Sequence, residues 1–125
     1  MKTTLVGLTA VICLSACISP GTVSSEVTGD LLGHILTRTQ QYLQGDPVAL
    51  ATLNSRADRI TAAAGASEYI NAPALNRDVD FICTLHDQWV LQDPLLDPEM
   101  ARVYLRSSSI LRRLFATASA PDGFK

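Results

Sequence analysis

The sequence lacks the short motifs that are typical of several enzyme classes. It contains no Gly-x-Ser-x-Gly turn, which would present a serine nucleophile, and no glycine-rich loop that would hold a phosphate group. Its serine run, Ser107-Ser108-Ser109, lies inside a helical pattern that points the three hydroxyls in different directions. Asp93 and Asp97 are the best carboxylate pair, but each flanks a proline as the stop or the cap of a predicted helix. We therefore expect no catalytic residues and no enzyme activity.

A calcium-binding motif is also incomplete. Asn76, Asp78 and Asp80 alternate like the first oxygen ligands of an EF-hand loop. Phe81 stands at the sixth position, where such a loop needs glycine, and the later bidentate glutamate is missing. Capping of a helix by Asn76 or Asp78 explains the pattern more simply.

Cys83 and His86 are the residues that come nearest to a transition-metal or thiol site. They are three positions apart on one predicted helical face, so they could share an ion or form a thiolate–imidazole pair. A zinc site would need two further ligands. Both residues lie on the stripe expected to face the core, so we predict a buried, hydrogen-bonded His86 and neither a metal nor another cofactor.

The sequence has no apolar run long enough to span a bilayer near its start. Leu5 to Leu14 is about ten residues long, whereas a spanning helix needs roughly 20. The run follows the positively charged Met1-Lys2, and together they have the layout of a secretory signal. Leu14-Ser15-Ala16-Cys17 comes next and resembles the lipobox of bacterial lipoproteins, in which an apolar and two small residues precede the lipid-bearing cysteine.

This resemblance implies cleavage between Ala16 and Cys17, a diacylglycerol on the Cys17 thiol, and further acylation, such as palmitate, of the new amino terminus. Several acyl chains on one residue give stable membrane anchoring. Ile18 follows Cys17, and in a Gram-negative cell this implies the periplasmic side of the outer membrane, since Asp there would favour inner-membrane retention. In a Gram-positive cell the protein would lie on the outer face of the membrane.

Charge and cysteine content limit the partners of the mature chain. Lys2 leaves with the signal, so nine basic residues face twelve acidic ones and nucleic-acid binding is not expected. Cys13 also leaves and Cys17 takes the lipid, which makes Cys83 a single thiol. It is either buried and inert or available to another chain.

Four amphipathic helices are predicted in the mature chain. They cover residues 25–44, 47–64, from 76 or 78 to 92, and 98–118. Ser24 or Ser25 is expected to cap the first helix, and Gly45 is expected to end it with a left-handed backbone conformation. Asp46-Pro47 and Asp97-Pro98 are expected to start the second and fourth helices. Residues 65–76 are expected to form an irregular connection, and no run alternates β-branched residues. An all-α, up-down-up-down bundle follows, with a signal at 1–16, a tether at 17–25, the bundle at 26–120 and a tail at 121–125.

Two helical faces carry the functional expectations. On the third helix an apolar stripe includes His86 and Trp89, while Asp80 and Asp87 are expected to face away. On the fourth helix one broad apolar stripe is expected, centred on Ser107, whose hydroxyl bonds the carbonyl four residues earlier. The stripe consists of Met100, Val103, Tyr104, Ile110, Leu111, Leu114, Phe115 and Ala118.

Opposite that stripe, Arg102, Arg106 and Arg113 form a basic line. It suggests a surface for an anionic partner such as a phospholipid, lipopolysaccharide or acidic protein. The simpler alternative is a solvated helix face with Glu99 among its counter-charges.

The leading hypothesis is a non-enzymatic lipoprotein that binds or assembles another envelope protein and contacts the membrane through its anchor. A phage- or plasmid-type exclusion or lysis lipoprotein is one variant. A second hypothesis is a metal, haem or other ligand carrier, with an Ala- and Ser-lined seam between the second and fourth helices and with His86 and Trp89 lining the cavity. A third is a thiol enzyme that uses Cys83 and His86.

Overall fold

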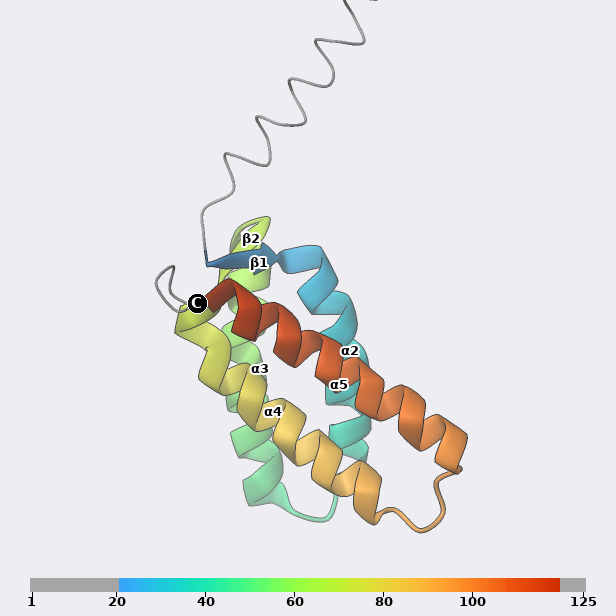
Figure 1. Cartoon of the computed structure of the whole chain (residues 1–125). Helices are drawn as coiled ribbons and strands as arrows, with labels where there is room; N and C mark the ends of the chain where they lie inside the picture. Colours follow the sequence, from blue (N-terminus) through green and yellow to red (C-terminus); the bar gives the residue numbers. More distant parts are fainter. Residues whose placement is uncertain (1–20, 120–125) are drawn as a thin grey trace, which may run out of the picture.

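The computed structural model describes residues 21–119, which form four helices and two short strands (Figure 1). Their order is β1 (Thr22–Ser24), α2 (Ser25–Tyr42), α3 (Pro47–Ala66), β2 (Tyr69–Asn71), α4 (Ala72–Gln92) and α5 (Pro98–Ser119). Successive helices run in opposite directions and are joined by short links, so the predicted all-α up-down bundle is confirmed. The two strands lie at the end of the bundle where the described chain both starts and finishes (Figure 1).

Side-chain caps set the start of the first two helices, as predicted. The Ser24 hydroxyl accepts a hydrogen bond from the Val27 amide at 3.4 Å. The Asp46 carboxylate accepts one from the Ala49 amide at 3.1 Å, and Pro47 follows at the first turn, where its missing N–H removes no helical bond.

The link between α2 and α3 differs from the prediction. Helix α2 ends at Tyr42 rather than at Gln44, and Gly45 is not left-handed, since the positive φ within residues 21–119 belongs to Gly21. The chain turns instead through a hydrogen bond from the Asp46 amide to the Leu43 carbonyl, at 2.9 Å. This bond satisfies an end carbonyl, so no left-handed residue is needed.

The two strands correct the predicted tether and the predicted irregular connection. β1 and β2 pair antiparallel, with Val23 opposite Ile70. Two further backbone bonds extend the pairing, from the Ser25 amide to Glu68 and from the Ala72 amide to Gly21, each at 2.8 Å. Val23 is 8% and Ile70 1% exposed, so the strands cover the end of the core.

Helix α4 starts earlier than predicted, at Ala72 instead of Asn76 or Asp78. Pro73, inside the connection predicted for residues 65–76, occupies the first turn of the helix instead, a position that proline tolerates. Asp78 therefore lies inside α4 and caps nothing. It is 6% exposed, and its carboxylate pairs with Arg56 at 3.2 Å and Arg59 at 3.4 Å, both from α3.

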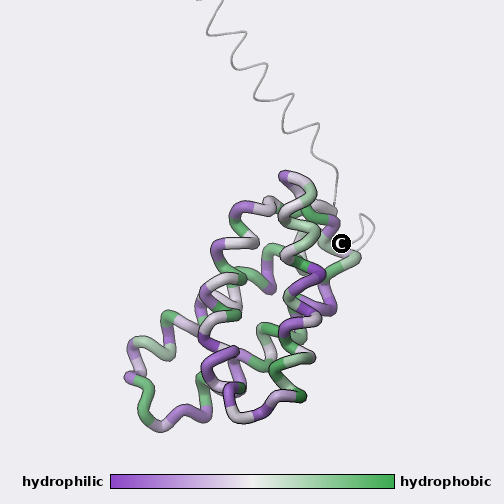
Figure 2. Tube along the Cα trace, turned by 180° about the vertical axis from the view of Figure 1, so that it is seen from behind, coloured by the Kyte–Doolittle hydropathy of each residue, from purple (hydrophilic) through white to green (hydrophobic). Residues whose placement is uncertain are grey.

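The core lies between all four helices. Hydrophobic and hydrophilic stretches alternate along each helix in Figure 2, as expected for helices that bury one side. Helices α3 and α4 each bury one apolar face, as predicted for α4, and each fully buried Ile or Leu side chain contributes about 1.5–3 kcal/mol. The buried residues on these two faces are Leu53, Ala57, Ile60, Ala72, Val79, Ile82, Cys83, His86 and Val90.

Helix α5 packs differently from the single broad stripe that was predicted. Its buried residues are Ser108, Leu111 and Phe115, while Met100 and Ile110 are each 41% exposed. The predicted bond from the Ser107 hydroxyl to the Val103 carbonyl is present at 3.2 Å. The apolar side of α5 is thus divided between an inward line and an outer line.

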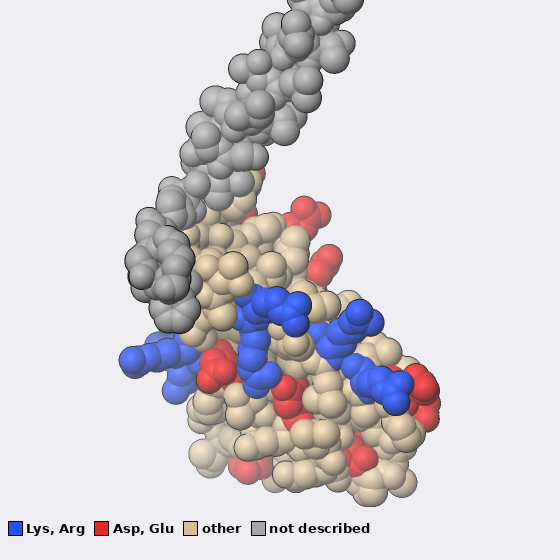
Figure 3. Space-filling view, in the orientation of Figure 1, with Lys and Arg blue, Asp and Glu red and all other residues tan. Residues whose placement is uncertain are grey.

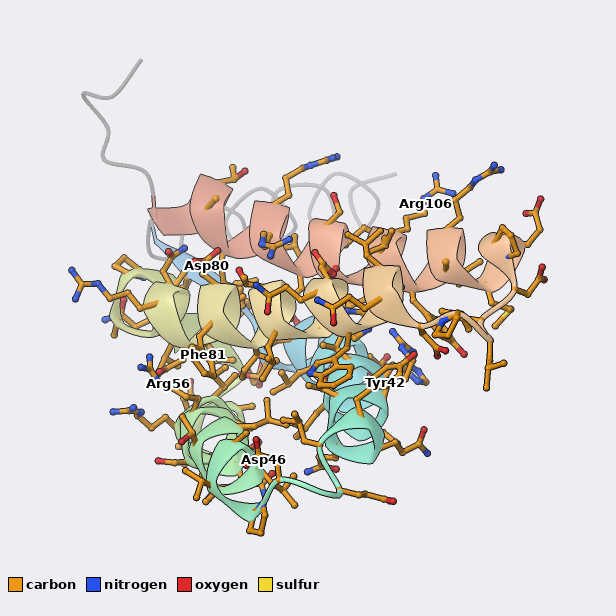
Figure 4. The ribbon with its side chains drawn as sticks, turned by 90° about the horizontal axis from the view of Figure 1, so that it is seen from below. Tyr42, Asp46, Arg56, Asp80, Phe81 and Arg106 are labelled. Carbon is orange, nitrogen blue, oxygen red and sulfur yellow. The ribbon has the colours of Figure 1, made fainter. Side chains whose placement is uncertain are left out.

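The seam expected between the second and fourth helices does not form. Helix α3 packs against α2 and α4, and α5 packs against the same two helices. In Figure 4, α5 and α3 lie on opposite sides of the bundle. Within residues 21–119, no helix has the length and apolar content required of a membrane span.

Candidate functional site

Cys83 and His86 are both fully buried on the inward face of α4. The Cys83 thiol is free, and burial raises its pKa to about 12. A thiol reacts as its thiolate, so this environment suppresses nucleophilic chemistry.

Both ring nitrogens of His86 are engaged by neighbours. Arg38 of α2 donates from Nε to His86 Nε2 at 3.1 Å, so Nε2 must be the acceptor nitrogen. The proton then lies on Nδ1, which donates to Asp87 Oδ1 at 3.1 Å. Desolvation lowers the pKa of His86, and this outweighs the opposing effect of Asp87. A neutral imidazole with both nitrogens bonded has no free lone pair for a metal or haem iron, so the ligand-carrier hypothesis gains no support here.

Asp87 joins α4 to α5, which corrects the expectation that it faces away from the bundle. The Ser108 hydroxyl donates to Asp87 Oδ1, and Arg112 Nη1 donates to Asp87 Oδ2 at 2.7 Å. Serine, histidine and aspartate therefore meet, but the serine hydroxyl bonds to the carboxylate and not to the imidazole. A catalytic triad needs the imidazole to take the serine proton, so this arrangement works as a partly buried polar link between α4 and α5.

Arg112 was missed by the sequence analysis, although it makes the densest set of contacts in this cluster. Besides Asp87, it donates to the Thr84 hydroxyl at 3.0 Å and to Asp80 at 3.4 Å. Asp80, Thr84 and Asp87 are spaced four and three apart and so share one side of α4. This polar stripe lies beside the apolar stripe of α4, and it could have indicated that a basic side chain of another helix packs there.

The EF-hand-like residues are occupied by arginines of other helices. Asp78 pairs with Arg56 and Arg59, and Asp80 pairs with Arg112. Figure 4 shows Arg56 beside Phe81, and its guanidinium lies 4.7 Å from the centre of that ring. Within residues 21–119, no group of three or more His, Cys, Asp or Glu side chains is placed to hold a metal ion.

Asp93 has the structural role that its position beside a proline predicts. Its Oδ1 accepts from the Leu95 amide at 3.0 Å, and its Oδ2 accepts from the Tyr42 hydroxyl at 2.7 Å. The bond from Tyr42 is the main reason that the pKa of Asp93 is lowered. Tyr42 also stacks on Trp89 with the ring centres 5.5 Å apart, which ties α2 to the end of α4. Asp97 opens α5 through its carbonyl, which accepts from the Ala101 amide at 2.9 Å.

The predicted basic line is exposed on α5. Arg102, Arg106 and Arg113 are all exposed, and Figure 3 shows basic side chains gathered along this helix. Arg106 points away from the other helices in Figure 4. Arg102 lies 3.8 Å from Glu99, with side chains 80% and 77% exposed, so the pair contributes little. Among residues 21–119, no carboxylate lies within 4.0 Å of Arg106 or Arg113.

An open apolar hollow of about 560 Å³ lies where α5 meets the strands. Ile110, Leu114 and Ala118 of α5 line one side, and Val23 and Tyr69 line the other. Arg113 also lines the hollow. The outer side of α5 therefore combines exposed apolar side chains, unpaired positive charge and a hollow, and we take it as the candidate binding surface.

The predicted lipidation and cleavage residues, Ala16 and Cys17, lie outside the described residues. Comparison of the chain with protein-family models, curated proteins and solved structures finds no match.

Proposed function

We propose that this chain is a lipid-anchored protein of the cell envelope that acts by binding, with the outer side of α5 as its binding surface. The observation that carries the proposal is Leu14-Ser15-Ala16-Cys17 behind a short apolar run, the pattern that resembles a lipobox. In a Gram-negative cell this address corresponds to the periplasmic side of the outer membrane.

The described residues support binding over catalysis by what their reactive groups are doing. The Cys83 thiol is held protonated in the core, and His86 uses both nitrogens to join Arg38 and Asp87. Arg106 and Arg113, by contrast, extend into solvent without acidic neighbours among residues 21–119. An anionic partner would supply the missing counter-charge.

Replacement of Cys17 tests the anchor. Cys17→Ser should abolish incorporation of a radioactive fatty acid and leave the chain at precursor size, because the thiol that receives diacylglycerol is gone. Cys13→Ser is the matched control. Cys13 lies in the apolar run just before the lipobox-like residues, so its replacement removes a nearby cysteine and should leave labelling intact. Mass spectrometry of the parent should show loss of residues 1–16 and the added lipid. Continued labelling of Cys17→Ser, or a mature mass without lipid, would overturn the proposal.

A further inference from the structure

The outer side of α5 carries an apolar line with regular spacing. Its apolar members are Met100, Val103, Ile110 and Leu114, and the small polar residues Ser107 and Thr117 occupy the same line. These positions alternate steps of three and four, so they lie along one side of the helix. Val103 is 54% exposed and Met100 and Ile110 are each 41% exposed, although α5 already buries Leu111 and Phe115 in the core. Helix α5 thus has a second apolar side that the bundle leaves uncovered.

Arginines follow one edge of this outer line. Arg102, Arg106 and Arg113 each directly precede one of its members in the sequence. Helix α5 contains four arginines and one acidic residue, Glu99, in a chain whose net charge is −2. Arg112 pairs with Asp87 and Asp80, and Arg102 lies 3.8 Å from Glu99, so within residues 21–119 the charge without a carboxylate partner belongs to Arg106 and Arg113. A long arginine side chain lets the charge reach phosphate while its methylenes cover apolar surface.

The end of α5 lies close to the point where the chain leads to Cys17. A methyl group added to Gly21 would come within 3.4 Å of the Ala118 carbonyl oxygen. Three residues separate Cys17 from Gly21, and an extended chain spans at most about 3.6 Å per residue. Gly21 therefore lies within about 14 Å of Cys17, and this end of α5 lies directly beside Gly21, so a lipid on Cys17 would hold it close to the headgroups.

We propose that the outer side of α5 lies against an anionic phospholipid surface, with its arginines on the phosphates and its apolar line at the boundary between headgroups and acyl chains. This inference rests on the proposed lipidation, which supplies the short tether and a high local lipid concentration. The hollow beside Ile110 and Leu114 receives apolar lipid atoms at the tethered end. A helix of a partner protein would also fit the spacing, but the tether places lipid at this surface first.

Depth-dependent quenching tests the orientation. The native lipidated protein is prepared with Ile110→Cys or Ala62→Cys, labelled with a small fluorophore and reconstituted into phosphatidylcholine vesicles with or without phosphatidylglycerol. Ala62 is exposed on α3, the helix that lies across the bundle from α5 in Figure 4, and it is four residues from the end of α3 that leads to β2, which makes it a stringent control. Cys83 is buried, so the parent protein reports any background labelling. With phosphatidylglycerol, nitroxide lipids should quench the Ile110 label at least about twofold more than the Ala62 label.

Charge variants test the lipid class. Arg106→Gln with Arg113→Gln should reduce the ratio of docked to undocked protein by roughly fivefold per arginine and should reduce the quenching of the Ile110 label. Arg77→Gln removes an exposed arginine from α4 and should leave that quenching unchanged. An equal effect per arginine in Arg77→Gln and in the α5 pair, or quenching that is independent of phosphatidylglycerol, would overturn the proposal.

The remaining outcomes separate this inference from the proposed function. A lipid-bearing mass combined with equal quenching at Ile110 and Ala62 refutes docking and leaves the anchor intact. A mass without lipid refutes the anchor, and the docking proposal is refuted with it. If the Ile110 label is shielded from a water-soluble quencher in native membranes but not in lipid vesicles, a protein partner covers α5 and the membrane proposal is wrong.

Discussion

At the scale of single residues, burial decides what the polar groups of this bundle can do. His86 accepts from Arg38 and donates to Asp87, so its neutral form is part of the packing. A proton added to Nε2 would meet the Arg38 guanidinium, and desolvation already lowers the pKa of the ring. The same histidine on an exposed face would be a candidate ligand or base.

This burial predicts acid sensitivity. Because the pKa of His86 is lowered in the folded state, the unfolded chain binds a proton first as the pH falls below about 6.5. The free energy of unfolding should therefore be level above that pH and should decrease below it, by at most about 1.4 kcal/mol per pH unit from this group. Thermal melts between pH 5 and 8 measure the effect.

Two variants assign this acid sensitivity to His86. His34→Asn changes an exposed histidine and should keep the parent slope between pH 5 and 6.5. His86→Asn should lower the melting temperature at all pH values but flatten that slope. A parent slope retained in His86→Asn would show that another group is responsible.

Asp87 and Arg112 show that the pattern of one helix does not predict which residues of a neighbouring helix it contacts. A helical wheel gives the angle of Asp87 correctly, but it does not show which neighbour lies at that angle. Helix α5 supplies Ser108 and Arg112 there, so an aspartate expected to face solvent becomes the centre of a cluster. The Asp87 carboxylate is 20% exposed, and these partners compensate for the water it has lost.

At the scale of elements, the helices were predictable and the strands were not. Helix starts depend on local residues, and the caps at Ser24 and Asp46 occur where the sequence places them. The strand Thr22–Ser24 pairs with a partner more than forty residues away, and each strand has three residues, too few to show alternation. The predicted start of α4 was wrong because Pro73, which lies in its first turn, is compatible both with a break and with the start of a helix.

The paired strands should contribute to stability through the residue they bury. Ile70→Ala should reduce the free energy of unfolding by about 2–4 kcal/mol, because Ile70 is 1% exposed and its loss leaves a cavity at the end of the core. Urea denaturation measures the change. Tyr69→Ala is the matched control in the same strand, and since Tyr69 is 41% exposed it should cost less than about 1 kcal/mol. Equal losses would mean that the strand end does not belong to the cooperative core.

At the scale of the whole molecule, apolar surface and charge are distributed unevenly. The exposure of Arg102, Arg106 and Arg113 was predictable, because a basic line opposite an apolar stripe is visible on a wheel. The outer apolar line could not be distinguished from the sequence, because on a helical wheel it adjoins the inward line of Leu111 and Phe115 and the two read as one stripe. Only the packing of α5 on α2 and α4 shows which part of the stripe remains uncovered.

The bundle as a whole should protect Cys83 from modification. The thiol is 0% exposed in a core formed by all four helices, so a small alkylating agent reaches it only when the packing opens. For a domain of ordinary stability, its alkylation should be at least about a thousandfold slower than that of Ala62→Cys, whose thiol would lie on the surface. The rate should increase with urea in parallel with unfolding measured by circular dichroism. Alkylation of Cys83 at the rate of the surface thiol in native buffer would show that α4 opens locally, and it would make the thiol–imidazole hypothesis for Cys83 and His86 worth testing again.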